Sequence, residues 1–215
     1  MTKTFQRSLL AMALALSTSA VHAARIDSSE LKVTGSLEVP ACTVTAGDDG
    51  SYSYGTLNPS DIRPGTAINT LAVLTKPWKI SCEGDTYLTF KVIDNAEATR
   101  SVVAAENFGL GSVNGTGKIG FYTVNMRNPK VNGVASNLFS TNTTAIVRAS
   151  VMPLRQNDYV TGWAQAGANV QQIGKLFEAD LDVTATLAGT QTMNGAITDD
   201  VPLAGSLTLN FAYGL

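Results

Sequence analysis

Short runs of alternating apolar and polar residues, separated by turn residues, dominate this chain. A period of two places the apolar side chains on one face of a β-strand. On this basis strands are predicted at 39–44, 53–57, 78–82, 87–93, 118–126, 145–152, 177–187 and 205–213. Helical periodicity is nearly absent, and the best helix candidate, 164–172, is interrupted by Gly167 and is interpreted as a loop or a single turn. Residues 127–145 are interpreted as a long polar loop or a hairpin arm. Short strands at this spacing predict one all-β domain of the β-sandwich class.

The two ends of the chain carry the most informative alternation. Near the beginning, one face of an extended segment is apolar, with a glycine in the same row: Leu31, Val33, Gly35, Leu37 and Val39. A free apolar strand of this kind is an aggregation hazard unless another sheet takes it up. At the far end the last predicted strand presents Leu207, Leu209, Phe211 and Tyr213 on one face, and only two residues follow. A sandwich of the immunoglobulin type has a further strand that covers this one, so we expect a surplus strand at the front and a shortage at the back.

The first 23 residues have the features of a secretory signal peptide. Lys3 and Arg7 supply positive charge, and 9–16 is an apolar core too short to span a bilayer. Small residues at −3 and −1 predict cleavage between Ala23 and Ala24. No later stretch is long and apolar enough for a transmembrane helix. We therefore expect an exported protein without a transmembrane segment.

The charge and histidine content of the mature chain argue against several classes of function. Loss of the leader removes two bases and no acid, so the net charge falls from −2 to −4, which argues against nucleic acid as a partner. The only histidine, His22, leaves with the leader, so the mature chain cannot hold a Ser-His-Asp or Cys-His site or a His-ligated zinc. Residues 107–157 contain five bases and no acid, whereas 176–215 contain five acids and no base. This predicts either two solvated surfaces or a head-to-tail contact between copies.

The only two cysteines are Cys42 and Cys82. In an oxidising compartment a disulfide is the default, and their spacing excludes a CxxC redox site. Such a bridge closes a loop of about 40 residues and contributes roughly 3–4 kcal/mol if it acts on chain entropy.

Four further features of the sequence are candidates for a binding or catalytic role. Residues 115–120 fit GxGxxG, but no helix follows, so a glycine turn is favoured over a dinucleotide site. Asp180 and Asp182 share a strand face, which suggests either a carboxylate pair for glycoside hydrolysis or two solvated acids, the reading we favour. Asp94 is interpreted as a turn residue, with metal binding as the alternative. Trp78 and Trp163 could stack on a sugar. Trp78 is expected in the core, and Trp163 is the better candidate for an exposed binding residue, although packing is favoured for it too.

Residues 33–44, Val-Thr-Gly-Ser-Leu-Glu-Val-Pro-Ala-Cys-Thr-Val, resemble the start of mature subunits of chaperone–usher pili. The first cysteine stands seven residues after Gly35, and the second follows in 79–82. The segment 54–57 is similar to the Gly-containing strand between the family's cysteines, and 205–213 to its closing strand with a terminal Tyr. Features at 92–95, 108–111 and 117–122 also look like a fimbrial-like branch of exported proteins. Two departures are that Tyr213 is not penultimate and that Asp199, not Gly, stands fourteen residues before it.

The resemblance implies an incomplete immunoglobulin-like β-sandwich, the pilin fold, with a signal peptide at 1–23, a donor-strand arm at 24–34 and the domain at 35–215. It also implies that Cys42 and Cys82 form the disulfide of the first two strands. Each subunit's open groove is filled by a periplasmic chaperone and then, at an outer-membrane usher, by the arm of the next subunit, which is strand addition to an exposed edge. The donor face is Leu31, Val33, Gly35, Leu37 and Val39, and the acceptor edge is Leu207, Leu209, Phe211 and Tyr213. Burial of four such apolar side chains is worth roughly 6–12 kcal/mol before ordering costs.

The resulting prediction is a structural, non-enzymatic subunit of a fimbria or fimbria-like fibre involved in cell adhesion. Its partners are neighbouring subunits of the same or another kind, the chaperone and the usher, with no cofactor and no metal. It resides in the periplasm during assembly and then at the cell surface. The alternatives are a self-contained periplasmic or secreted β-sandwich that binds a sugar or small ligand, and an enzyme with the carboxylate pair Asp180 and Asp182. A further alternative is that the terminal strands pair within one chain as ordinary edge strands.

Overall fold

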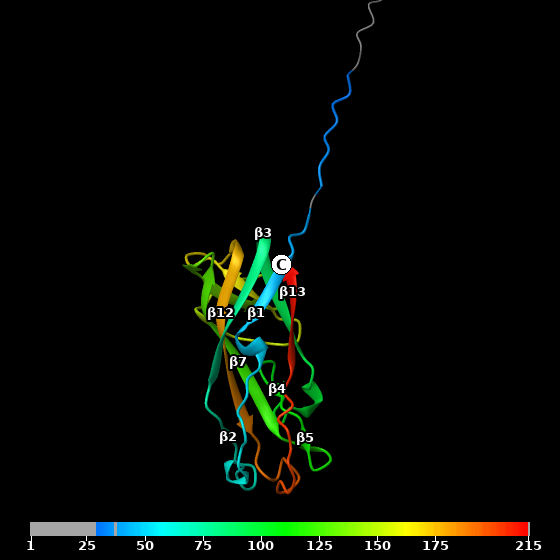
Figure 1. Ribbon diagram of the computed structural model, residues 1–215, viewed down its shortest axis with the longest axis vertical. Helices are drawn as coiled ribbons and strands as arrows, with labels where there is room; N and C mark the ends of the chain where they lie inside the picture. The colour runs from blue at the N-terminus through cyan, green and yellow to red at the C-terminus, as the bar shows by residue number, and fades with distance from the viewer. Residues whose placement is uncertain (1–28, 37, 215) are drawn as a thin grey trace, which may run out of the picture. The chain divides into compact units, whose positions relative to one another are not determined.

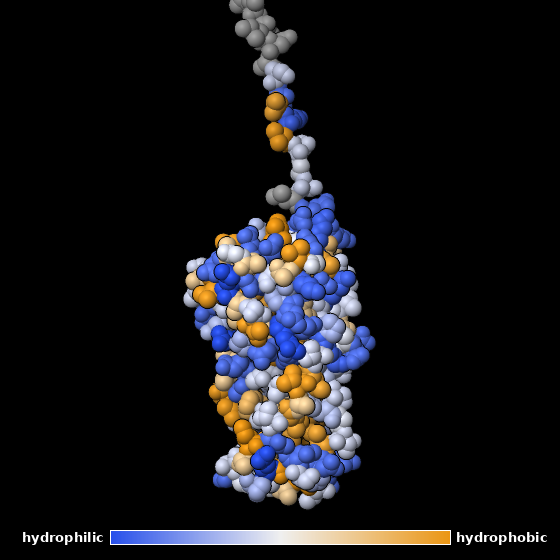
Figure 2. All heavy atoms as spheres, turned by 90° about the vertical axis from the view of Figure 1, so that its left-hand side faces the viewer, coloured by the Kyte–Doolittle hydropathy of each residue, from blue (hydrophilic) through white to orange (hydrophobic). Residues whose placement is uncertain are grey.

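A computed structural model describes residues 29–36 and 38–214 of the chain. The chain divides into two units, 1–38 and 39–215. The described residues of the first unit form no strand or helix, and Leu31 and Val33 are 86% and 89% exposed. Figure 2 shows apolar residues on the surface of this segment. The predicted leader, its cleavage site at Ala23 and Ala24, and Leu37 lie outside the described residues. The compact unit begins at Val39, a few residues after the domain start that the sequence suggests.

The second unit is all-β, as predicted (Figure 1). Its strands are β1 Cys42–Ala46, β2 Asn69–Thr70, β3 Leu74–Asp94, β4 Phe108–Gly109, β5 Ser112–Val113, β6 Gly117–Lys118, β7 Gly120–Val131, β8 Val134–Ala135, β9 Asn137–Thr141, β10 Val151–Pro153, β11 Val160–Ala164, β12 Ile173–Leu187 and β13 Leu207–Tyr213. Three short 3₁₀ turns accompany them: η1 Gly47–Gly50, η2 Pro59–Asp61 and η3 Glu97–Thr99. The candidate helix 164–172 is a loop after β11.

The long strand β3 organises a curled antiparallel sheet. Its first half lies between β1 and β12, with Cys42 opposite Cys82 and Phe177 opposite Ile80. Its second half lies between β13 and β11. Beyond β12 the sheet continues through β7 to β10, and beyond β11 it continues to β9. Two strands predicted separately at 78–82 and 87–93 are therefore one element, which passes without a break through the polar residues around Gly84.

Alternation builds the core inside this curl. Residues of β3, β7 and β12 are alternately buried, and an aromatic cluster joins the strands: Trp163 packs against Phe90 and Phe177, with ring centroids 6.2 and 5.2 Å apart. Trp163 is therefore a core residue, so packing, the favoured interpretation, is confirmed and the exposed binding role is not. The buried strand β11, which pairs with β9, was not predicted there. Trp78, expected in the core, is half-buried and packs against the hydrophobic core.

Pro77 limits the pairing of the first strand. The ladder between β1 and β3 ends with Ala46 opposite Trp78. The next residue along β3 is Pro77, which has no amide hydrogen with which to continue a ladder. The chain then turns through η1, where Asp48, Asp49 and Gly50 adopt positive φ. The segment that follows, predicted as a strand at 53–57, consequently runs outside the sheet.

Candidate functional site

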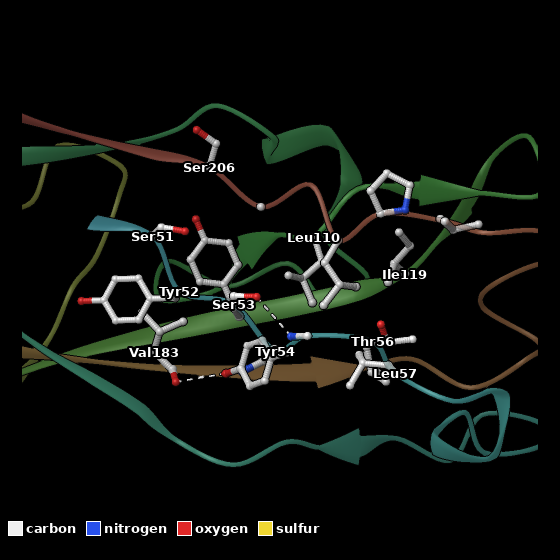
Figure 3. A pocket seen from close by; sticks show the side chains of 18 of the residues that line it. Ser51, Tyr52, Ser53, Tyr54, Thr56, Leu57, Leu110, Ile119, Val183 and Ser206 are labelled. Carbon is white, nitrogen blue, oxygen red and sulfur yellow. Dashed lines mark hydrogen bonds between the residues drawn. The ribbon is translucent and has the colours of Figure 1, made fainter. Parts of the chain in front are cut away.

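A long groove opens between two segments that belong to no strand (Figure 3). One wall is the segment 50–59, and the other is the segment 197–206, which leads into β13 at Leu207. The floor consists of apolar side chains from β7, β12 and the neighbouring loops: Leu110, Ile119, Tyr122, Val124, Leu181, Val183, Ala185 and Leu187. The cavity volume is about 1040 Å³. The molecule therefore leaves an elongated piece of its apolar interior open to solvent along one side.

Two tyrosine hydroxyls, rather than a backbone ladder, attach the first wall to the sheet. The Tyr52 hydroxyl donates to the Leu181 carbonyl oxygen at 3.3 Å, and accepts a hydrogen bond from the Trp78 indole at 3.0 Å. The Tyr54 hydroxyl donates to the carbonyl oxygen of Val183 at 3.1 Å, and accepts from the amide of Ala185 at 2.9 Å. Burial raises the pKa of both phenols, so the neutral, donating form is favoured.

At its upstream end the same wall is fixed by an ion pair. Lys76, on β3, pairs with Asp48 in η1, and its ammonium also lies 5.6 Å from the centre of the Tyr52 ring. The hydrogen bond and charge of Lys76 lower the pKa of Asp48. This contact holds the turn that directs the chain from β1 into the groove wall.

The main chain of both walls makes few hydrogen bonds to other main-chain groups. Within the described residues, the only bond between main-chain groups made by 51–57 is from the Ser51 amide to the Asp48 carbonyl. In the opposite wall, 197–205 makes one, from the Ala204 amide to the Leu110 carbonyl. Exposed main-chain donors and acceptors on two facing segments are the feature that strand addition uses.

Toward the other end, edge strands β1 and β13 also lack cover. Val44 lies opposite Ile80, and both side chains point to the core side of the sheet, yet Val44 is 42% exposed and Ile80 only 2%. Tyr213 lies opposite the buried Leu88 and is 45% exposed. Residues paired across two strands lie at equal depth, so a difference of this size means that the edge strand lacks a neighbour on its other side. Neither strand has a second partner within the described chain.

The predicted acceptor residues divide into two sets. Leu207 lines the groove. Leu209 and Phe211 are half-buried against the core, where Phe211 lies 5.4 Å from Phe90 between ring centroids. The groove thus lies beside the segment before β13, and Leu207 is the one residue of β13 that lines it. Of the predicted donor residues, Leu31, Val33 and Val39 are exposed and Gly35 has open space around it.

The predicted disulfide between Cys42 and Cys82 is present, with an S–S distance of 2.07 Å. It lies where β1 begins, beside the end of β13. The Tyr213 hydroxyl donates to the carbonyl oxygen of Pro40, and the Glu83 amide donates to the Ala41 carbonyl at 2.9 Å. Residues 40–42 are therefore fixed to both β3 and β13.

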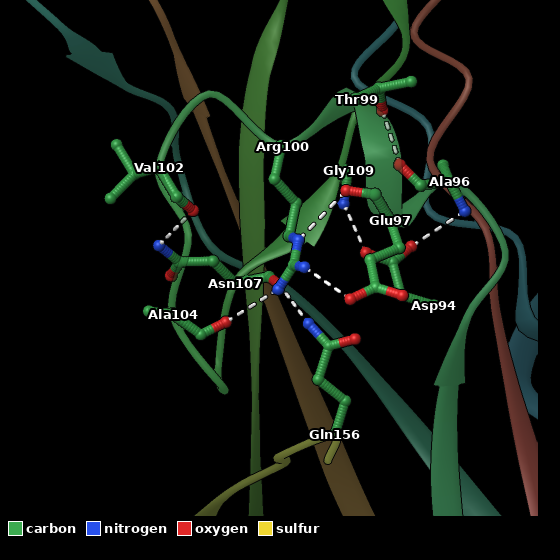
Figure 4. A network of polar contacts seen from close by, with 10 residues as sticks. All are labelled: Asp94, Ala96, Glu97, Thr99, Arg100, Val102, Ala104, Asn107, Gly109 and Gln156. Atoms are coloured by element: carbon green, nitrogen blue, oxygen red, sulfur yellow. Dashed lines mark hydrogen bonds and ion pairs between the residues drawn. The ribbon is translucent and has the colours of Figure 1, made fainter.

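A buried polar network supports one end of the floor (Figure 4). The Asp94 carboxylate, at the end of β3, accepts hydrogen bonds from the amides of Ala96 and Gly109, each at 2.9 Å. Arg100 is buried and pairs with Glu97 at 2.5 Å, and Gln156 donates to the carbonyl of Asn107 at 3.0 Å. Asp94 thus serves the main chain of the loop between β3 and β4. The described residues contain no group of three or more ligands that could hold a metal ion.

The two carboxylates of the enzyme alternative are engaged by neighbouring strands. Asp182 accepts from Thr75 at 2.6 Å and pairs with the Nε of Arg127 at 2.7 Å, while Asp180 accepts from the Asn128 amide at 2.7 Å. Glu178 lies opposite both Lys79 and Lys130 in the ladders. Part of the basic middle of the sequence therefore faces the acids of β12 within one chain. Of the glycines in the GxGxxG sequence, Gly115 lies in the turn between β5 and β6, Gly117 begins β6 and Gly120 begins β7, and no helix follows them in the described chain.

Sequence reasoning missed the walls of this groove. Tyr52 and Tyr54 alternate with serines and are flanked by Gly50 and Gly55, a pattern that also fits an ordinary strand such as the one predicted at 53–57. A signal was available, since Pro77 excludes continued pairing with β3 and two tyrosines two residues apart can replace it by hydroxyl bonds. The segment 197–203 carried no periodic pattern that would have marked it as the second wall.

Comparisons with protein families, curated proteins and solved structures found no match to this chain. None of the helices in the part of the chain described above is long and apolar enough to cross a membrane.

Proposed function

We propose that this protein is a structural subunit of a fimbria-like surface fibre, assembled when an extended strand from a neighbouring chain fills the groove. In this proposal the curled sheet is an incomplete immunoglobulin-like sandwich of the pilin type. A periplasmic chaperone holds the groove until an outer-membrane usher exchanges it for the arm of a neighbour. The observation that carries the proposal is the pair of facing groove walls whose main chain lacks partners, above an apolar floor.

Three further observations support it. The segment before the compact unit has an exposed apolar row, Leu31 and Val33, of the alternation that strand addition requires. The edge strands β1 and β13 carry core-facing side chains that remain exposed. The disulfide between Cys42 and Cys82 is typical of proteins that fold in an oxidising compartment such as the periplasm.

The decisive experiment separates donating from accepting in the mature chain. Leu31→Asp/Val33→Asp removes the apolar donor face, and the matched control Lys32→Asp/Thr34→Asp changes the opposite face of the same segment. Leu207→Asp places a charge in the groove, and Thr208→Asp is its control on the outward face of β13. Association is followed by sedimentation velocity with and without a periplasmic chaperone.

We expect the donor variant to lose self-association but still bind a peptide of residues 29–39, and the Leu207 variant to lose peptide binding. The two control variants should behave like the unmodified protein. The proposal is wrong if the donor and groove variants associate as the unmodified chain does.

A second function, binding of a sugar or other small ligand, is favoured by one observation. Tyr52, Tyr54 and Trp78 gather at one end of the groove, and aromatic rings are common in ligand pockets. The same preparation tests it, since a small ligand would quench tryptophan fluorescence in a Trp78-dependent way and would bind without any arm. Saturable binding of a glycan by the donor variant, with no peptide binding, would favour this second function.

A further inference from the structure

The charge around the groove is of one sign. Among all residues that line it, the only charged ones are Asp199 and Asp200, and no lysine or arginine lines it. Both aspartates are exposed and lie on the wall that leads to β13. An extended segment entering the groove therefore meets an apolar floor with two negative charges on one rim.

These two acids differ from the other acids of the C-terminal third. Those on β12 lie beside bases or amides of neighbouring strands, as Asp182 does beside Arg127. Asp199 accepts one hydrogen bond, from the Thr198 hydroxyl at 3.2 Å, and neither Asp199 nor Asp200 forms an ion pair within the described chain. Their charge is thus available to whatever fills the groove.

The part of the N-terminal segment that carries the apolar row does not supply a matching charge. Segment 29–39 contains Glu30 and Glu38 but only one base, Lys32. Its apolar row fits the alternation that a groove requires, yet its net charge has the same sign as the rim. A second copy of the chain is therefore an electrostatically poor donor for this groove.

We infer that the groove selects an extended segment of a different chain, one that alternates apolar residues and carries lysine or arginine where it passes Asp199 and Asp200. This inference rests on the proposed function and adds the chemistry of the partner. Complementary charge of this kind governs the choice among partners and the association rate more than total affinity. For exposed pairs it amounts to about a two- to fivefold preference for each pair formed, and salt screens it.

The test uses three peptides with the same apolar row. The first is residues 29–39 as they stand, the second has both glutamates replaced by glutamine, and the third has both replaced by lysine. Each is titrated by fluorescence anisotropy into the full mature chain carrying Leu31→Asp/Val33→Asp, so that no arm competes for the groove. A second titration uses the same chain with Asp199→Asn/Asp200→Asn added.

We expect the lysine peptide to bind about two- to tenfold more tightly than the glutamate peptide at 20 mM salt, with the glutamine peptide between them. The three peptides should bind with equal affinity at 0.5 M salt, and also to the chain that carries Asp199→Asn/Asp200→Asn. Equal binding of the three peptides, or an order that survives in the Asn/Asn chain, overturns the inference and leaves strand binding intact. Absence of binding by all three overturns the proposed function together with it.

Discussion

The hydroxyl of Tyr54 donates a hydrogen bond to the carbonyl oxygen of Val183, across 129 positions of sequence. The same hydroxyl accepts a hydrogen bond from the Ala185 amide of β12. This lies in the gap between the pairing of β12 with β3, which ends at Val183, and its pairing with β2, which begins at Thr186. One side chain thus replaces the backbone hydrogen bonds of a neighbouring strand at this point. The groove wall is thus attached to the floor through side chains, and its own main chain makes no ladder bond to the sheet.

Tyr54→Phe should destabilise the folded chain by about 1–3 kcal/mol, since the buried amide of Ala185 loses its partner. Urea unfolding followed by circular dichroism measures the change. Tyr87→Phe is the matched control, because Tyr87 is largely exposed, and it should change stability by less than about 0.5 kcal/mol. Equal effects of the two substitutions would show that the Tyr54 hydroxyl does not hold the wall.

Loss of the disulfide should lower the free energy of unfolding by about 3–4 kcal/mol, the chain-entropy value for a loop of this length. Cys42→Ala/Cys82→Ala is compared with the unmodified protein in urea, with and without a reductant. The reductant should destabilise only the unmodified protein. In periplasmic expression, Cys42→Ser should also lower the yield of folded chain, and an unchanged yield and melting temperature would count against this role.

Stability should decline at alkaline pH. Burial, assisted by the charge of Asp94, raises the pKa of Tyr122 in the groove floor, and burial raises the pKa of Tyr52 and Tyr54 as well. The unfolded chain loses these protons first, near pH 10, so the stabilisation is complete below about pH 10 and is lost as the pH rises toward the folded pKa. Tyr122 alone contributes a slope of at most about 1.4 kcal/mol per pH unit.

Urea unfolding between pH 9 and pH 11.5 measures this slope. Tyr122→Phe keeps the ring that packs against Phe108, with centroids 5.4 Å apart, and removes only the titrating group. The decline should be shallower in this variant. Identical slopes in the two proteins would exclude Tyr122 as a source of the pH dependence.

Asp94→Ala should destabilise the chain by about 1–3 kcal/mol, because the amides of Ala96 and Gly109 lose their common acceptor. Asp158→Ala is the control, since Asp158 is an exposed acid whose one ion pair, with Lys91, is at the surface. Hydrogen exchange should show faster opening at Gly109 in the first variant alone. Unchanged exchange there would mean that the carboxylate does not organise this loop.

Alternation predicted the all-β class and most of the long strands, because one-sided burial leaves a clear period of two. Alternation failed to predict a strand that is buried on both faces, and it failed where a glycine inside a strand resembles a turn. β11 is short and nearly fully buried, so the sequence around Trp163 shows no alternation. β3 runs through Gly84, which looks like a turn but lies against Pro40, where a Cβ would come within 3.3 Å of that ring.

The candidate site was only partly predictable for a related reason. The alternation of residues in β13 predicted its apolar face, and in the structure the side chains on that face are half-buried against the core. The groove depends on segments 51–57 and 197–205, whose positions are set by Pro77, by two tyrosine hydroxyls and by contacts more than a hundred residues away. Such long-range contacts leave no periodic trace in a single sequence.

The bridge between Cys42 and Cys82 also determines how the molecule transmits a mechanical pull. Tension applied to the chain before Pro40 reaches β3 directly through the two sulfur atoms, and residues 43–81 form a closed loop outside that path. The groove wall 51–57 lies within this loop, so the wall carries no tension when the oxidised chain is stretched. Reduction would redirect the same tension along the wall, whose attachment consists mainly of two phenol groups.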